Sequence, residues 1–133
     1  MRYLLDTNIV LELLLNQDKA EDVISFLEQT PMEECCLTDF ALYSIGLILF
    51  RQAKKNIFVD LFQDLFTNNG MNLLKIPPNN LADLVEVSDK FHLDFDDAYH
   101  YCLAKLYQLV LVSFDHDFDR TDLTRIQPGG LVS

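Results

Sequence analysis

The chain has 133 residues, of which half are hydrophobic and 23% are charged, a globular balance that excludes an intrinsically disordered or fibrous protein. Lys and Arg total 10 against 21 Asp and Glu, and the formal charge of −11 opposes general binding of nucleic acid over the surface. We expect one domain over residues 1–133, because a chain of this length can bury its own core.

The sequence does not predict a secreted or membrane-bound protein. Asp6 interrupts the first apolar stretch, so we expect no signal peptide, and no segment approaches the roughly 18 apolar residues that a membrane span needs. Cys35, Cys36 and Cys102 make an odd count without zinc-site spacing, and neighbours in a strand point to opposite faces. We therefore expect a cytoplasmic protein with reduced thiols.

Apolar runs and turn residues predict strands that alternate with helices. In chain order we expect a strand over Arg2–Leu5, helices over Ile9–Leu15 and Ala20–Leu27, a strand over Glu34–Leu37, a helix from Thr38 or Asp39 to Phe50, a helix over Ile57–Phe66, a strand over Met71–Ile76, helices over Leu81–Phe91 and Ala98–Leu106, and a strand over Leu109–Val112. This order predicts a three-layer α/β domain whose central, mainly parallel sheet has about four or five strands. Because residues 40–50 carry no charge, we expect that helix to be largely buried.

Aspartates stand where strands end or helices begin. Asp6 follows the first strand, Asp97 opens a helix, and Asp115 follows the last strand. In parallel α/β sheets ligands bind beyond the carboxyl ends of the strands. If these ends converge, two carboxylates about 4 Å apart repel by roughly 4 kcal/mol at an effective dielectric constant of about 20, and the pocket attracts a cation. Hard oxygen ligands favour Mg²⁺ or Mn²⁺, which suits phosphodiester cleavage.

Each acid also has an ordinary structural interpretation. Asp6 could cap the helix that follows it, and Asp96 and Asp97 could act only as favourable charges at a helix N-terminus. Asp117 could belong to an acidic surface loop. Capping alone does not explain why Asp115 repeats the position of Asp6 at the end of another strand.

Two other acid motifs fail on inspection. An EF-hand loop starting at Asp115 would have Arg120 where Gly is needed and Ile126 where Glu is needed. Residues 117–121 match the D-x-D-x-T pattern of haloacid-dehalogenase phosphatases, but lie too near the C-terminus for the sheet that should follow. The histidines show no ligand pairing, and only His116, beside Asp115, is a candidate proton carrier.

Three motifs together resemble the PIN domains, in particular the small VapC-like ribonuclease toxins. Asp6-Thr7-Asn8 resembles the family's opening D-T-[NS], and Asp97-Ala98 with Ala104 resembles the helix that carries its third acid. The run 113–118, S-F-D-H-D-F, resembles its [TS]-x-D-x-x-F. Each motif is weak alone, but their order and spacing extend over nearly the whole chain.

The resemblance implies a metal-dependent endoribonuclease, the toxin of a toxin–antitoxin pair. It implies RNA as substrate, an antitoxin partner, which the acidic charge suggests carries a basic segment, and a homodimer, which is common in the family. The implied catalytic and Mg²⁺- or Mn²⁺-binding residues are Asp6, Asp97 and Asp115; the auxiliary residues that orient or support them are Thr7, Asn8, Ser113 and Asp117.

One departure from the family affects the expected activity. The family usually has a Glu about six positions after a Ser or Thr on the helix that follows the second strand, and counting from Thr38 gives Ser44. A hydroxyl cannot replace that charge, although Asp39 could compensate if its side chain turns inward. The loss favours an attenuated enzyme, or an alternative function as a PIN-like binding module without turnover that acts through a protein or RNA partner.

Overall fold

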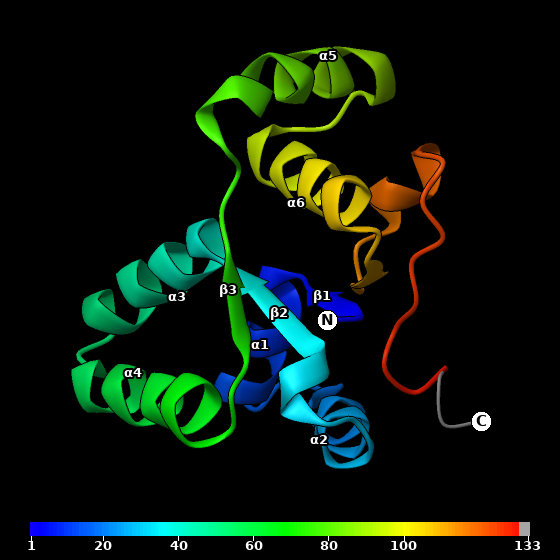
Figure 1. The fold of residues 1–133 in the computed structure, drawn as a ribbon. Helices are drawn as coiled ribbons and strands as arrows, with labels where there is room; N and C mark the ends of the chain where they lie inside the picture. The colour runs from blue at the N-terminus through cyan, green and yellow to red at the C-terminus, as the bar shows by residue number, and fades with distance from the viewer. Residues whose placement is uncertain (131–133) are drawn as a thin grey trace.

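The computed structural model describes residues 1–130 and contains a parallel four-stranded sheet (Figure 1). The strand order is β3-β2-β1-β4, with every neighbouring pair parallel. The strands are β1 (Tyr3–Leu5), β2 (Cys35–Thr38), β3 (Asn72–Leu74) and β4 (Val110–Val112). The predicted parallel sheet is confirmed. β1, β3 and β4 are shorter than the sequence pattern predicts, and β2 has the expected length but begins and ends one residue later.

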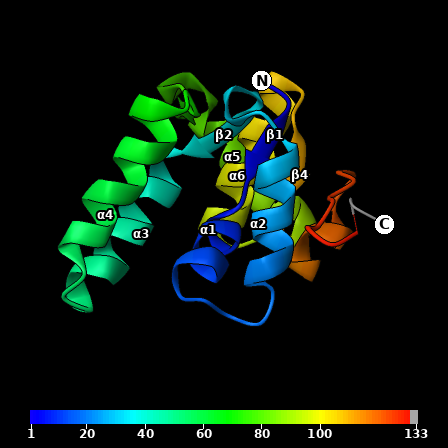
Figure 2. The ribbon, with the colours of Figure 1, turned by 90° about the horizontal axis from the view of Figure 1, so that it is seen from below.

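Helices cover both faces of the sheet, which confirms the three-layer prediction (Figures 1 and 2). Alternate residues of a strand serve opposite cores: Leu4 packs in the core under α5 and α6, whereas Leu5 packs in the core under α1 to α4. The helices are α1 (Thr7–Leu14), α2 (Ala20–Gln29), α3 (Asp39–Arg51), α4 (Lys55–Phe62), α5 (Leu81–Phe91) and α6 (Phe95–Tyr107).

Short helical turns join these elements. The helix expected over 57–66 begins at Lys55 and widens at Gln63 into a π-helical turn, η2 (Gln63–Asn68). Beyond β4 the chain forms the 3-10 turn η4 (His116–Arg120). The remaining 3-10 turns are η1 (Met32–Glu34) and η3 (Pro78–Asn80).

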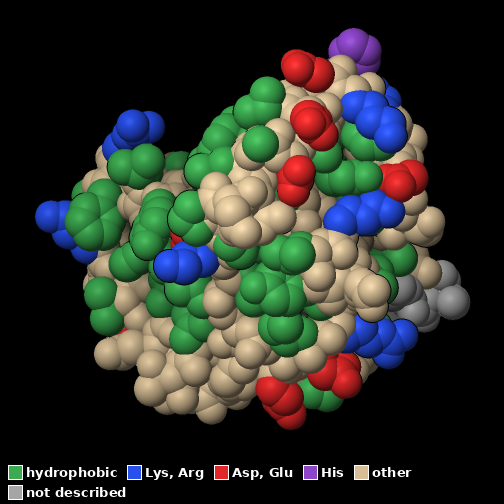
Figure 3. All heavy atoms as spheres, turned by 45° about the horizontal axis from the view of Figure 1, so that its top comes forward, with side chains coloured by type: hydrophobic (Ala, Val, Ile, Leu, Met, Phe, Trp, Pro, Cys, Tyr) green, Lys and Arg blue, Asp and Glu red, His purple; other side chains and the backbone are tan. Residues whose placement is uncertain are grey.

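The expectation that the uncharged helix α3 is largely buried is wrong. Ala41, Ile45 and Leu49 form its buried stripe. Tyr43 and Leu47 on its opposite side are 64% and 58% exposed. Absence of charge therefore did not identify burial, because a helix has more than one face and only the i, i+4 stripe meets the core. Hydrophobic side chains are visible over one face of the molecule in Figure 3.

The three cysteines are free thiols, as the sequence predicts. Burial is the main cause that raises the pKa of Cys35 to about 12 and the pKa of Cys102 to about 11, so these thiols resist ionisation. Within residues 1–130, none of the helices combines the length and apolar character that a bilayer crossing requires.

Candidate active site

Polar residues gather at the edge where β2, β1 and β4 end. Parallel strands present their carboxyl ends on the same side, so Asp6, Asp39 and Ser113 follow neighbouring strands along one edge. The register pairs Leu5 with Val112, and the Asp6 N–H donates to the Val112 carbonyl at 2.9 Å. This pairing places the residue after β1 beside the residue after β4.

The buried Ser113 hydroxyl joins the ends of these two strands. It donates to Oδ2 of Asp6 at 2.6 Å and accepts the Asp115 N–H at 2.9 Å. The Asn8 Nδ2 lies 3.5 Å from the same hydroxyl. Oδ1 of Asp6 accepts the Thr7 N–H at 2.7 Å. Asp6 is therefore the N-cap of α1, as the helix-capping interpretation of its position predicted. Its second oxygen, Oδ2, instead binds the Ser113 hydroxyl.

Three carboxylates converge next to Asp6 and Ser113. Oxygens of Asp97, Asp115 and Asp117 all lie within 4.8 Å of one another, and Asp97 is only 4% exposed. Asp97 also belongs to a group with Asp94 and Asp96 at the start of α6. Burial, a hydrogen bond with Asp94 and the charges of Asp96 and Asp115 raise the pKa of Asp97 to about 8. Such crowded acids hold either a proton or a cation.

The turn η4 fixes the last two acids relative to each other. Asp115 caps it by accepting the Asp117 N–H at Oδ1, 2.9 Å away. Arg120 pairs with Oδ1 of Asp117 at 2.8 Å, and Phe118 is fully buried and anchors the turn to the core. The surface-loop interpretation of Asp117 agrees with its exposure, yet its carboxylate still lies within the acid group.

The family model described as PIN domain matches residues 3–123. The chain belongs to the PIN domain family. No curated protein matches the sequence.

Solved structures of other bacterial proteins have the same fold as this PIN domain. VapC20 of Mycobacterium tuberculosis, described as a Sarcin-Ricin loop cleaving toxin, has a TM-score of 0.77 at 14% identity, covering 95% of this chain and 99% of that one. FitAcB of Neisseria gonorrhoeae has a TM-score of 0.73 at 22% identity, and the match covers 96% of this chain and 98% of FitAcB. A chain of a toxin–antitoxin complex from Klebsiella pneumoniae has a TM-score of 0.71 at 18% identity, and the match covers 87% of this chain and 89% of that one. At these identities the likeness establishes the fold.

Asp39, on the helix where the family usually carries a glutamate, does not join the acid group. Oδ1 of Asp39 accepts the Phe40 N–H at 2.8 Å and the Tyr99 hydroxyl at 2.7 Å. Ser44 is half-buried on α3. Among residues 1–130, the acid groups with oxygens within 4.8 Å contain neither Asp39 nor Asp6. Compensation by Asp39 and ligation by Asp6 stay predictions.

His100 lies in the site of this PIN domain, although no motif predicted a role for it there. The ring is buried, with Nε2 3.8 Å from Oδ1 of Asp6. Nδ1 lies 2.8 Å from the Asp96 carbonyl, which can only accept, so Nδ1 carries a hydrogen. Nε2 has no hydrogen-bond partner among the described residues. Its position three residues after Asp97, on the same side of a helix, was the available signal.

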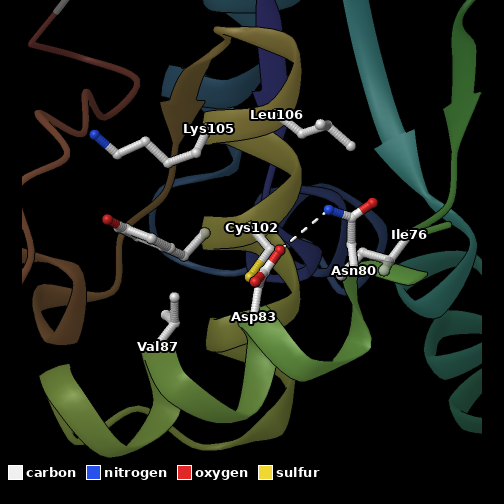
Figure 4. A pocket seen from close by; sticks show the side chains of 8 residues that line it. Ile76, Asn80, Asp83, Val87, Cys102, Lys105 and Leu106 are labelled. Carbon is white, nitrogen blue, oxygen red and sulfur yellow. Dashed lines mark hydrogen bonds between the residues drawn. The ribbon is translucent and has the colours of Figure 1, made fainter. Parts of the chain in front are cut away.

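A cavity of about 260 Å³ lies between α5 and α6 (Figure 4). Ile76, Val87 and Leu106 contribute apolar walls, and Asn80 donates to Asp83 inside it at 3.1 Å. The converging acids Asp97, Asp115 and Asp117 are not among its lining residues. The candidate active site is therefore the acidic sheet edge rather than this cavity.

Proposed function

We propose that this PIN domain is a divalent-metal-dependent endoribonuclease that hydrolyses RNA phosphodiesters and acts as the toxin of a toxin–antitoxin pair. The proposal is carried by the convergence of Asp97, Asp115 and Asp117 within 4.8 Å at the carboxyl edge of a parallel sheet. PIN domains of VapC toxins are typically nucleases, and the structurally similar VapC20 is described as cleaving the Sarcin-Ricin loop.

The donor set of the acid group fits Mg²⁺ or Mn²⁺. Three carboxylates offer hard oxygens at mutual distances that one ion can bridge, and Asp115 and Asp117 keep some exposure to solvent and substrate. The raised pKa of Asp97 marks a position where a cation would relieve the repulsion. We propose Asp97 and Asp115 as ligands with Asp117 beside them, and Asp6 as the further acid of the set.

The other residues keep the acids in one geometry. The Ser113 O–H and the Thr7 N–H fix the two oxygens of Asp6, and Asn8 contacts the same serine hydroxyl. A divalent ion held by Asp97, Asp115 and Asp117 would supply Lewis-acid chemistry, which stabilises the negative charge that phosphodiester hydrolysis develops. Fixed carboxylates do not reorganise during that step, which lowers its cost.

An open groove beside the site offers space for the RNA strand. It has a volume of about 430 Å³, and Asn8, Lys19 and Phe114 are among its lining residues. Lys19 Nζ lies 4.7 Å above the Phe114 ring. A cation and an aromatic face beside the acids suit a phosphate and a stacked base of a single-stranded substrate. We propose this groove as the approach for RNA.

The acidic surface fits a basic protein partner. The formal charge of −11 would attract an antitoxin with a basic segment, and the similar Klebsiella pneumoniae structure is a toxin–antitoxin complex. We further propose a homodimer and a cytoplasmic location, where such a toxin would meet RNA.

Cleavage of structured and single-stranded RNA by the purified chain in Mn²⁺, Mg²⁺ or EDTA tests the nuclease. Asp97→Asn and Asp115→Asn should abolish the metal-dependent cuts. Asp89→Asn, which changes an exposed acid on α5, should leave them intact. Equal cutting by all variants would identify a contaminant and refute the assignment.

The alternative is a PIN-like binding module without turnover. Ser44 favours it, because a hydroxyl stands where the family usually has a carboxylate. RNA binding without cleavage in any metal, by a chain that binds Mn²⁺, would support this alternative. Ser44→Glu should then restore cutting if the missing charge is the cause.

A further inference from the structure

The Arg125 side chain is largely shielded from solvent, although the residue lies beyond the part of the chain that matches the PIN domain. The match ends at residue 123, and the Arg125 side chain is only 10% exposed. A buried guanidinium is costly unless its N–H groups are satisfied. We therefore expect the N–H groups of Arg125 to have hydrogen-bond partners within the fold.

The guanidinium spans the turn that carries Asp115 and Asp117. At one end, Nη1 donates to the Ser113 carbonyl at 3.0 Å and to Oε1 of Gln127 at 3.1 Å. At the other end, Nε and Nη2 donate to the two oxygens of Asp119 at 2.9 and 3.2 Å. Two parallel bonds of this kind fix orientation as well as distance.

Arg125 also contacts the His116 ring. Its Nη2 lies 2.8 Å from Nδ1 of His116, and because a guanidinium only donates, Nδ1 must accept. The neutral ring then carries its hydrogen on Nε2. The 3.4 Å contact between Nδ1 and Asp119 joins two acceptors in that state and is not a hydrogen bond.

The backbone around Arg125 is tied to the sheet as well. The Ser113 N–H donates to the Ile126 carbonyl, and the Ile126 N–H donates to the Leu111 carbonyl, both at 2.9 Å. The backbone is thus fixed at Ile126, the residue next to Arg125, whose side chain reaches across the turn. Residues 113 and 119 are both held, and the two acids lie between them.

We propose that Arg125 is a positioning residue, which holds the turn between Ser113 and Asp119 so that Asp115 and Asp117 meet Asp97 in a metal-binding arrangement. The inference rests on the proposed function, since it assigns Arg125 to the metal affinity of that site. Arg125 contacts Ser113, which in turn holds Asp6 and the Asp115 N–H. Through Ser113, this one side chain beyond the family match therefore acts on Asp6 and on Asp115.

Arg125→Met and Arg125→Lys test this role in the full chain. The first removes every donor; the second keeps the charge but cannot reproduce the planar fork. Lys105→Met is the matched control, because Lys105 pairs with Asp122 at 2.9 Å in the same region without contacting the turn. Mn²⁺ affinity is measured by calorimetry below the melting temperature, and amide hydrogen exchange is followed at Asp115 and Asp117.

We expect Arg125→Met to weaken Mn²⁺ binding by about 10–100-fold, the usual effect of losing a residue that supports a metal ligand. Exchange of the Asp115 and Asp117 amides should accelerate, since their acceptors are Ser113 Oγ and Asp115 Oδ1. Arg125→Lys should have an Mn²⁺ affinity and exchange rates between those of the wild type and Arg125→Met. Lys105→Met should have the affinity and exchange rates of the wild type.

Unchanged affinity and exchange in a folded Arg125 variant would overturn the proposal, as would equal loss in the Lys105 control. If Arg125→Met does not fold, the Arg125→Lys comparison decides alone. RNA cleavage is measured separately on the wild type. A wild type that binds Mn²⁺ without cutting RNA would refute the nuclease and leave the Arg125 comparison intact.

Discussion

The Ser113 hydroxyl lies 2.6 Å from Oδ2 of Asp6, although the two residues are 107 positions apart in the sequence. The bond joins the end of β4 to the end of β1, and Ser113 is fully buried. Asp6 is thereby oriented by a neighbouring strand as well as by its own helix cap. The sheet edge is a site with interdependent parts rather than a row of separate helix caps.

Ser113→Ala should destabilise the protein. The change leaves the Asp115 N–H and Oδ2 of Asp6 without a buried partner, and such losses cost about 1–3 kcal/mol of unfolding free energy. Urea unfolding measures the difference. Ser113→Thr, which keeps the hydroxyl, should retain more of the stability than Ser113→Ala. Greater stability of the alanine variant would show that the hydroxyl bonds contribute little.

Stability of the metal-free protein should fall as pH rises from about 4 to about 8. The pKa of Asp97 is raised to about 8 and the pKa of Asp96 to about 6, in both cases mainly by burial, whereas an unfolded Asp has a pKa of about 3.9. Between these values the folded state binds more protons than the unfolded state, so the unfolding free energy decreases with pH. Thermal melts in EDTA at about pH 5 and about pH 9 measure this slope. Asp97→Asn should flatten it, and a wild-type melting temperature that rises over the interval would contradict the assignment.

Metal binding should show the opposite pH dependence. Below pH 8 an ion must displace the proton of Asp97, so Mn²⁺ affinity should increase by about tenfold per pH unit for each proton released. Calorimetry in buffers of different ionisation enthalpy gives both the affinity and the number of protons released. An Mn²⁺ affinity that does not change with pH would show that the ion does not displace a proton from Asp97.

Sequence periodicity predicted the layers and the order of elements because those follow from apolar spacing. The alternation of Leu4 and Leu5 between two cores is the period-two pattern of a strand buried on both faces. The same reasoning failed for Tyr43 and Leu47, since an uncharged helix can still present one face to solvent. Composition identifies apolar residues but not the side on which a neighbouring element packs.

The site could be predicted in part, because motifs name residues but not their contacts. Asp6, Asp97 and Asp115 were predicted as metal ligands from their positions after strands or at a helix start, and Asp117 only as an auxiliary residue. The structure brings Asp97, Asp115 and Asp117 together in one acid group, which does not contain Asp6. His100 and Arg125 were missed as site residues. Their roles depend on contacts across the fold, with Asp6 in one case and Ser113 in the other. The helical spacing from Asp97 placed His100 on the same side of α6, but it did not show the contact with Asp6, and no local pattern pointed to Arg125.

His100→Leu should change the unfolding free energy by no more than about 1 kcal/mol. The variant loses the bond from Nδ1 to the Asp96 carbonyl, but it also removes Nε2, a buried nitrogen that has no partner in the described structure. These effects oppose each other, and leucine has a similar volume. Chemical denaturation provides the measurement. A loss above about 3 kcal/mol would show that Nε2 makes a strong interaction with Asp6.

Asp39→Asn should reduce stability without changing Mn²⁺ affinity. Oδ1 of Asp39 is engaged by the Tyr99 hydroxyl and the Phe40 N–H, and the Tyr99 hydroxyl also accepts the buried Ile76 N–H at 3.1 Å. Tyr99→Phe should therefore cost more than Asp39→Asn, about 1–3 kcal/mol, because it leaves a buried amide unsatisfied. Urea unfolding and Mn²⁺ calorimetry on both variants, beside Asp97→Asn, separate the two roles. A fall in Mn²⁺ affinity in Asp39→Asn as large as that in Asp97→Asn would instead make Asp39 the acid that replaces the missing family glutamate.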